Sequence, residues 1–121
     1  MNDETAPPSL PADAHADAAA AFVDRARSRH AEEIVDLYVF GSTVRGDAHG
    51  RSSDVDILVV LDEAANRDVT ADSLRDLALD VTIAYGPAVE LHILSETTFA
   101  RYRREGNPFI RNVVTEGRSY V

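Results

Sequence analysis

The strongest candidates for catalytic or metal-binding residues in this sequence are two aspartates spaced two residues apart. Asp54 and Asp56 open an apolar run, residues 54–61, that is typical of a buried strand. Side chains two apart on a strand share a face, so both carboxylates would lie close together, and they would repel unless a cation or a proton lay between them. Because Leu58 and Val60 continue this face as apolar residues, we favour a Mg²⁺ site over a merely polar strand end.

A Gly-Ser pair ends the preceding apolar run and predicts a turn that could hold phosphates. Gly41 and Ser42 follow residues 34–40, which are rich in β-branched and aromatic side chains. Such a turn exposes backbone N–H groups and a hydroxyl to phosphate oxygens. The guanidinium of Arg45 could donate further hydrogen bonds to the same phosphates. Alone this signal is weak, because Gly-Ser turns and surface arginines are both common.

A third acidic residue lies on the next predicted strand, residues 89–94. Glu90 and His92 share one face of this strand, and the apolar residues between them form the other. If this strand pairs beside the aspartate strand, Glu90 is expected to be a third metal ligand or the general base that takes a proton from an attacking hydroxyl. The alternative is that Glu90 and His92 decorate a solvated face.

The elements that must position these residues follow from the hydrophobic periodicity. Helices are predicted over residues 13–30, 70–85, 96–105 (capped by Ser95) and 108–116, and strands over 34–40, 54–61 and 89–94. The order α-β-β-α-β-α-α predicts an α/β (α+β) fold with a small mixed sheet flanked by helices. Residues 1–14, rich in Pro, Ala and Asp, are predicted to be a disordered leader, which leaves a domain over residues 15–121.

Composition narrows the class of protein. The 121 residues carry a net charge of −9, and every basic residue is Arg. This balance resembles that of haloarchaeal proteins adapted to a salt-rich cytoplasm, although a GC-rich genome would also favour arginine. The acidic excess argues against nonspecific nucleic-acid binding, which needs a basic surface. The absence of cysteine excludes disulfides and thiolate chemistry. With no apolar run of about 20 residues and no secretory signal pattern, we expect no membrane span and a cytoplasmic location.

Three scattered histidines and a cluster of arginines are expected to be ordinary surface residues. His15, His30 and His49 lack the spacing of metal ligands and are expected at the surface. The cluster of Arg101, Arg103 and Arg104 is expected to be a solvated helix face, with a partner or nucleotide contact as the alternative.

Taken together, the motifs resemble the nucleotidyltransferase superfamily typified by DNA polymerase beta. Its signature is Gly-Ser, a spacer of about ten residues and Asp-x-Asp; here the spacer between Ser42 and Asp54 has eleven residues. The string GSTVRGDAHGRSSDVDILVVL is similar to the minimal nucleotidyltransferase branch. The resemblance spans residues 34–121 and includes the segments VELHILS and NPFIRNVVTEG.

The resemblance implies a role for each site residue. Gly41 and Ser42 would hold the triphosphate of ATP, and Asp54 and Asp56 would bind two Mg²⁺ ions that stabilise the attacking and leaving oxygens at the α-phosphate. The third carboxylate of the family is usually an aspartate on the neighbouring strand. The matching position is Glu90, one methylene longer, which leaves full catalytic competence open.

The resemblance also implies a partner, because the chain has no room for an acceptor-binding domain. In the minimal branch the usual partner is an all-helical HEPN toxin, so the implied protein is an antitoxin that transfers AMP from ATP to a tyrosine of that toxin, as a hetero-oligomer or homodimer. One alternative is an antitoxin that neutralises its partner by binding alone. Another is a nucleotidyltransferase for a small molecule such as an aminoglycoside.

Overall fold

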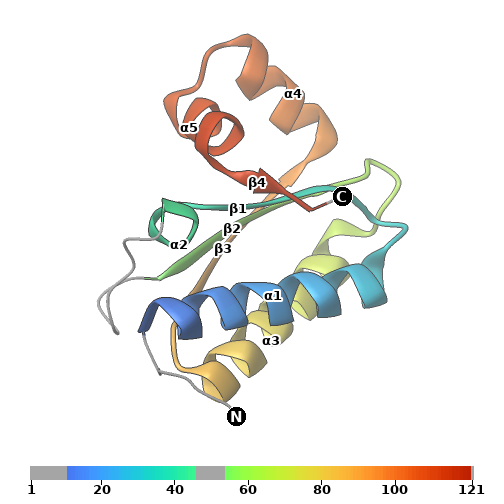
Figure 1. The fold of residues 1–121 in the computed structure, drawn as a ribbon. Coiled ribbons are helices and arrows are strands. Elements are labelled where there is room, and N and C mark those ends of the chain that lie inside the picture. Colours follow the sequence, from blue (N-terminus) through green and yellow to red (C-terminus); the bar gives the residue numbers. More distant parts are fainter. Residues whose placement is uncertain (1–10, 46–53, 121) are drawn as a thin grey trace.

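A mixed sheet separates two pairs of helices (Figure 1). The computed structural model describes residues 11–45 and 54–120, and of residues 11–13 and 45 it describes the backbone alone. Within these ranges the sheet has four strands in the order β3-β2-β1-β4. They are β1 (Ile34–Phe40), β2 (Val55–Leu61), β3 (Val89–Ser95) and β4 (Arg118–Ser119). The predicted small mixed sheet flanked by helices is confirmed.

The pairing of the strands decides which side chains meet. β1 pairs antiparallel with β2 and with β4, whereas β2 pairs parallel with β3. A parallel neighbour requires a crossover, and the helix α3 (Arg67–Tyr85) supplies it. The register sets Asp56 opposite Glu90 and Leu58 opposite His92.

The helices agree with the predicted ones except at some ends. α1 (Pro11–His30) begins inside the predicted leader, so residues 11–14 are helical, and residues 1–10 lie outside the described part. α3 begins earlier than predicted because Asn66 caps it, accepting a hydrogen bond from the Val69 N–H at 3.3 Å. α4 (Glu96–Arg104) has the expected Ser95 cap, and α5 (Pro108–Glu116) opens with proline at its first turn. The one-turn helix α2 (Ser42–Arg45) and the short strand β4 were not predicted.

One face of the sheet packs against α1 and α3. Alternate residues of β2 point into this layer, including Val55, Ile57 and Val59, and they meet apolar side chains of both helices. The expectation of a surface position for His15 is wrong, because this side chain is fully buried. It continues the buried stripe of α1 one turn toward the N-terminus, three residues before Ala18.

The opposite face packs against α4 and α5 around a smaller cluster. Leu58 and Val60 of β2 meet Phe99 of α4 and Ile110 of α5 there, together with Tyr38 of β1. Burial raises the pKa of the Tyr38 hydroxyl, and its hydrogen bond to Asp36 raises it further. This is the face on which Asp56 lies.

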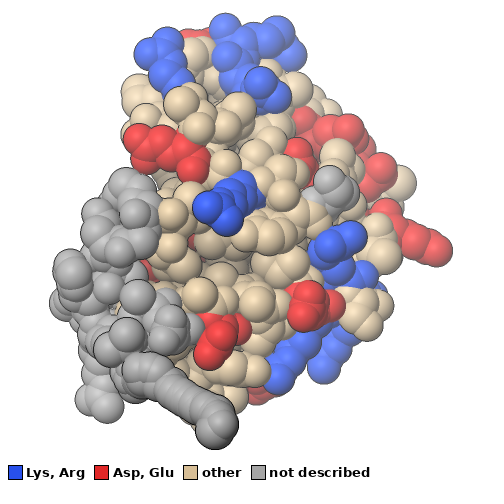
Figure 2. Space-filling model, in the orientation of Figure 1, with Lys and Arg blue, Asp and Glu red and all other residues tan. Residues whose placement is uncertain are grey.

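The charges are unevenly distributed over the molecule. Figure 2 shows basic side chains gathered at the end of the molecule formed by α4 and α5, where the last turn of α4 holds Arg101, Arg103 and Arg104. All three of these arginines are exposed. In the part of the chain that the structure describes, no helix has the length and apolar character needed to cross a membrane.

Candidate active site

Asp56 stands at the point where a buried strand face begins. It is the second residue of β2, it is half-buried, and Leu58 and Val60 follow on the same side of the strand. The predicted position of this aspartate at the edge of an apolar face is therefore confirmed.

The parallel pairing of β2 with β3 brings two further ligand atoms to Asp56. One side-chain oxygen or nitrogen each from Asp56, Glu90 and His92 lies within 4.8 Å of the other two. Asp56 and His92 are half-buried, whereas Glu90 is exposed. The expectation that Glu90 lies beside the aspartate strand is confirmed. The inclusion of His92 was not predicted, although its place on the same face as Glu90 was.

Asp54 does not belong to this group in the described structure. It precedes β2 by one residue, its side chain is exposed, and residues 46–53 before it lie outside the described part. Its role as a metal ligand stays a prediction.

Gly41 is required where β1 turns into α2. Its φ is +80°, a left-handed conformation that favours glycine, and a Cβ on this residue would overlap the Oδ2 atom of Asp56. The backbone therefore approaches the carboxylate as closely as it can. Ser42 follows at the first position of α2, and the Val44 N–H donates to the Gly41 carbonyl at 3.1 Å. The side chain of Arg45, predicted to contact phosphate, lies outside the described part.

A cavity of about 300 Å³ opens beside these residues. Its walls come from the β1–α2 turn, from β2 and from α5, and consist of Phe40, Gly41, Ser42, Asp56, Phe109, Asn112 and Glu116. Sequence reasoning missed the contribution of α5. The signal was present, because positions 109, 112 and 116 share one side of a helix whose Ile110 and Val113 are buried.

Two aromatic rings contact the imidazole of His92. The ring of Phe109 lies 5.0 Å from it and the ring of Phe40 5.9 Å, centroid to centroid. The two phenylalanine rings meet edge to face at 5.5 Å. These contacts come from β1 and α5, so three elements together determine where the imidazole lies.

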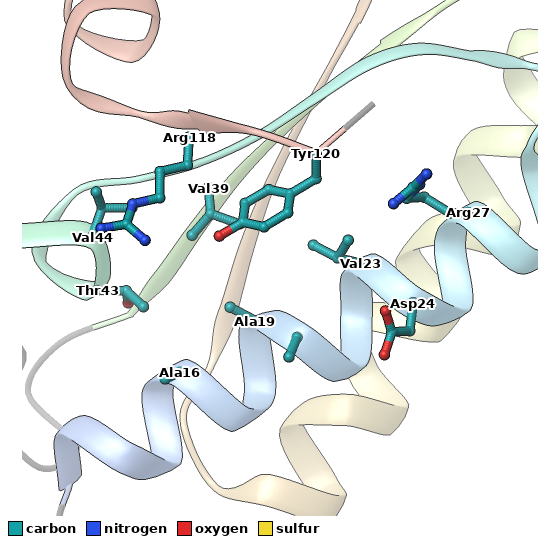
Figure 3. A pocket seen from close by; sticks show the side chains of 11 residues that line it. Ala16, Ala19, Val23, Asp24, Arg27, Val39, Thr43, Val44, Arg118 and Tyr120 are labelled. Carbon is teal, nitrogen blue, oxygen red and sulfur yellow. The ribbon is translucent and has the colours of Figure 1, made fainter.

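A second cavity, of about 270 Å³, lies between α1, α2 and the C-terminal segment. In Figure 3 the side chains of Arg118 and Tyr120 reach over this space, and Ala16, Ala19 and Val23 of α1 face it. None of the three clustered ligand residues lines it. It is therefore separate from the cavity beside Asp56.

The clustered donors suit a divalent cation. Two carboxylates and one imidazole are common ligands of such ions, and Gly41 leaves the Asp56 carboxylate room that any larger residue would fill. Together with the cavity lined by Gly41 and Ser42, the arrangement can hold a metal next to a phosphate group.

Comparison with known proteins identifies relatives of the chain. The model of the nucleotidyltransferase domain family matches residues 20–121. The Methanocaldococcus jannaschii protein MJ0604, named as a candidate protein adenylyltransferase, is 34% identical over 97 residues, which cover 80% of this chain and 88% of that protein.

Solved structures share the fold. A crystal structure of the toxin–antitoxin MntA-HpeT, in a mutant form, superposes with a TM-score of 0.54 at 21% identity, covering 80% of this chain and 68% of that one. A crystal structure of a toxin–antitoxin with AMP-PNP gives a TM-score of 0.54 at 22% identity, covering 81% and 68%. These likenesses establish the common fold.

Proposed function

This chain belongs to the nucleotidyltransferase domain family, and we propose that it transfers AMP from ATP to a hydroxyl group of a partner protein. The observation that carries this proposal is the position of Asp56. Its carboxylate lies beside Glu90 on the parallel β2–β3 pair, and it borders the cavity that Gly41 and Ser42 also line. The similarity to a candidate protein adenylyltransferase supports the choice of a protein as acceptor.

The residues have distinct tasks in this reaction. Gly41 and Ser42 bind the triphosphate, with Arg45 as a further phosphate contact, and Asp54, Asp56 and Glu90 hold the metal. When bound, two Mg²⁺ ions supply charge stabilisation at the α-phosphate. The acceptor hydroxyl oxygen forms a bond to the α-phosphorus, and the bond from that phosphorus to the oxygen bridging to the β-phosphate breaks. Pyrophosphate leaves with that electron pair, and the exposed Glu90 carboxylate accepts the hydroxyl proton.

The acceptor we propose is a tyrosine of a HEPN-type toxin, which makes the chain an antitoxin in the cytoplasm. The fold shared with toxin–antitoxin structures supports this choice. Because the proposed acceptor is a side chain of another protein, the toxin must bind this chain for transfer to occur, so we expect a hetero-oligomer with the toxin or a homodimer.

The test is incubation with α-labelled ATP, Mg²⁺ and the partner toxin at high salt. We expect label on the toxin with the wild-type chain and at least a ~1000-fold slower transfer with Asp56→Asn, because loss of a metal-binding carboxylate removes several kcal/mol of transition-state stabilisation. Asp80→Asn is the matched control, because Asp80 is an exposed aspartate on α3. An unlabelled toxin, or equal labelling by Asp56→Asn, would contradict the proposal.

Two observations favour a second candidate function, an antitoxin that neutralises its partner by binding alone. Asp54 is exposed and stands outside the clustered donors, and Glu90 occupies the position where the resemblance expects an aspartate. The double variant Asp54→Asn, Asp56→Asn separates the two functions. Full neutralisation of the toxin by this variant would support binding alone, whereas its loss with the complex still formed would support AMP transfer.

A further inference from the structure

We infer that His92 is a protein ligand of the catalytic metal and that the site therefore binds a first-row transition-metal cation such as Mn²⁺ more tightly than Mg²⁺. The inference rests on the proposed function in one respect, that Asp56 and Glu90 hold a metal. It goes further by naming a nitrogen donor and the class of cation that this donor selects.

The geometry of the β2–β3 pair places the imidazole where a ligand must be. The parallel register sets Glu90 opposite Asp56, and His92 follows two residues later on the same face of β3. Two atoms bonded to one cation at about 2.1 Å each are at most about 4.2 Å apart. The three donor atoms already lie within 4.8 Å of one another, so small side-chain rotations bring all of them to one ion.

The surroundings of His92 hold the ring in this place. The rings of Phe109 and Phe40 lie 5.0 Å and 5.9 Å from it; His92 and Phe40 are half-buried, whereas Phe109 is exposed. A side chain packed between aromatic rings has fewer rotamers to lose when it binds an ion. An imidazole on a merely solvated strand face would have no such support. Phe109 belongs to α5, so this helix positions a metal ligand that belongs to β3.

The chemistry of a nitrogen donor determines the preferred cation. Mg²⁺ is a hard ion that favours oxygen ligands and retains several waters. Imidazole binds first-row transition metals more strongly, and the order of affinities among these metals is set by the ion as much as by the protein. Replacing one oxygen ligand by imidazole therefore shifts selectivity away from Mg²⁺. His92→Asn replaces the nitrogen donor by an amide oxygen of smaller size and should shift it back.

The experiment uses the purified full chain with Mn²⁺ alone. Mn²⁺ affinity is measured by the loss of the free-ion EPR signal, Mg²⁺ affinity by competition, and the ligand by electron spin-echo modulation, which detects nitrogen bonded to Mn²⁺. We expect nitrogen coupling in the wild type and Mn²⁺ binding at least ~10-fold tighter than Mg²⁺ binding. In His92→Asn the nitrogen coupling should vanish and Mn²⁺ affinity should fall about 10-fold, while Mg²⁺ affinity changes less than about 3-fold.

Controls separate this inference from its alternatives. His30→Gln removes another imidazole, one that is hydrogen-bonded to Glu33 and Ser73 and does not belong to the Asp56–Glu90–His92 cluster, and it should leave both affinities unchanged. Thermal unfolding shows whether each variant is folded, and the wild-type spectrum can decide against the inference without any variant. Mn²⁺ bound without nitrogen coupling would overturn the inference and leave the proposed function standing. Absence of Mn²⁺ and Mg²⁺ binding in the wild type would overturn both.

Discussion

The two faces of the sheet are built differently, and the difference explains where the site lies. In the described part of the chain, sixteen buried apolar residues form the layer against α1 and α3, and six form the layer against α4 and α5. The strand β2 serves both layers. Val55, Ile57, Val59 and Leu61 face the larger one, whereas Asp56, Leu58 and Val60 face the smaller one. At the edge of the smaller layer, the position on β2 that would continue the apolar face is occupied by the Asp56 carboxylate.

The helix α5 shows the same division of labour within one element. Ile110 and Val113 are buried in the smaller core, while Phe109, Asn112 and Glu116 line the cavity beside Asp56. By contrast, Leu74, Leu77, Ala78 and Val81 of α3 pack in the larger core, and no residue of α3 is among those that line the cavity beside Asp56. On the face covered by α1 and α3, the buried residues contribute to stability without touching the site. On the face covered by α4 and α5, the same helix contributes to both the core and the site.

The sharpest test of this separation compares two core truncations. Leu74→Ala on α3 and Ile110→Ala on α5 both remove a fully buried side chain, so each should lower the free energy of unfolding by about 2–5 kcal/mol in urea titrations. Only Ile110→Ala should also slow AMP transfer by the folded protein, because it disturbs the helix that lines the cavity. Equal loss of transfer in both variants would show that the two faces are not separable.

Gly41→Ala is expected to slow AMP transfer about 100-fold, because its Cβ would displace the Asp56 carboxylate. The left-handed backbone should also cost about 1–2 kcal/mol of stability. Gly106→Ala is the matched control: its φ is +71°, and its Cβ would meet only the end of Arg111 at 3.7 Å. The control should lose the same stability and keep its transfer rate, as measured by labelling and urea unfolding. If both variants transferred AMP equally well, the close approach of Gly41 would have no role in the site.

Salt should stabilise the protein, because its surface carries a net charge of −9. Raising KCl from about 0.1 M to molar concentration shortens the Debye length from about 10 Å to about 3 Å and screens this repulsion. We expect the free energy of unfolding to rise by on the order of 1 kcal/mol, which raises the melting temperature by several degrees. The double variant Asp76→Asn, Asp80→Asn removes two exposed negative charges from α3. It should raise the melting temperature at low salt and reduce the further rise that added salt produces. A melting temperature independent of salt would argue against a halophilic protein.

The smallest effect concerns Tyr38, which lies in the smaller core. Burial and the hydrogen bond to Asp36 raise its pKa above the ordinary value of 10.0, so the folded state keeps the proton that the unfolded state loses. The contribution is fully present below pH ~10 and is lost as the pH rises through the raised pKa. Tyr38→Phe should remove this part of the alkaline decline in unfolding free energy, measured at neutral and alkaline pH. An unchanged decline would place its origin elsewhere.

Much of the local structure could be predicted because it depends on neighbours in sequence. An apolar run marked β2, alternation marked β3, and helical spacing marked α1 and α3. Ser95 and Pro108 marked two helix starts, because capping and ring geometry act within one turn. The helical stripe of α1 also contains the sign that His15 is buried, because His15 lies three residues before the buried Ala18 on the same side of the helix.

The sequence by itself determined the four longer helices and the three longer strands, the spacing of Gly41-Ser42 and Asp54-x-Asp56, and the strand face on which Asp56, Glu90 and His92 would lie. Periodicity within a strand or helix settles which side of that element is apolar. Only the tertiary structure decided that β3 lies parallel beside β2, which brings Glu90 and His92 to Asp56. Only the packing of α5 across the sheet decided that Phe109 reaches the imidazole. Contacts between elements distant in sequence depend on strand order and helix packing, and no local pattern encodes these.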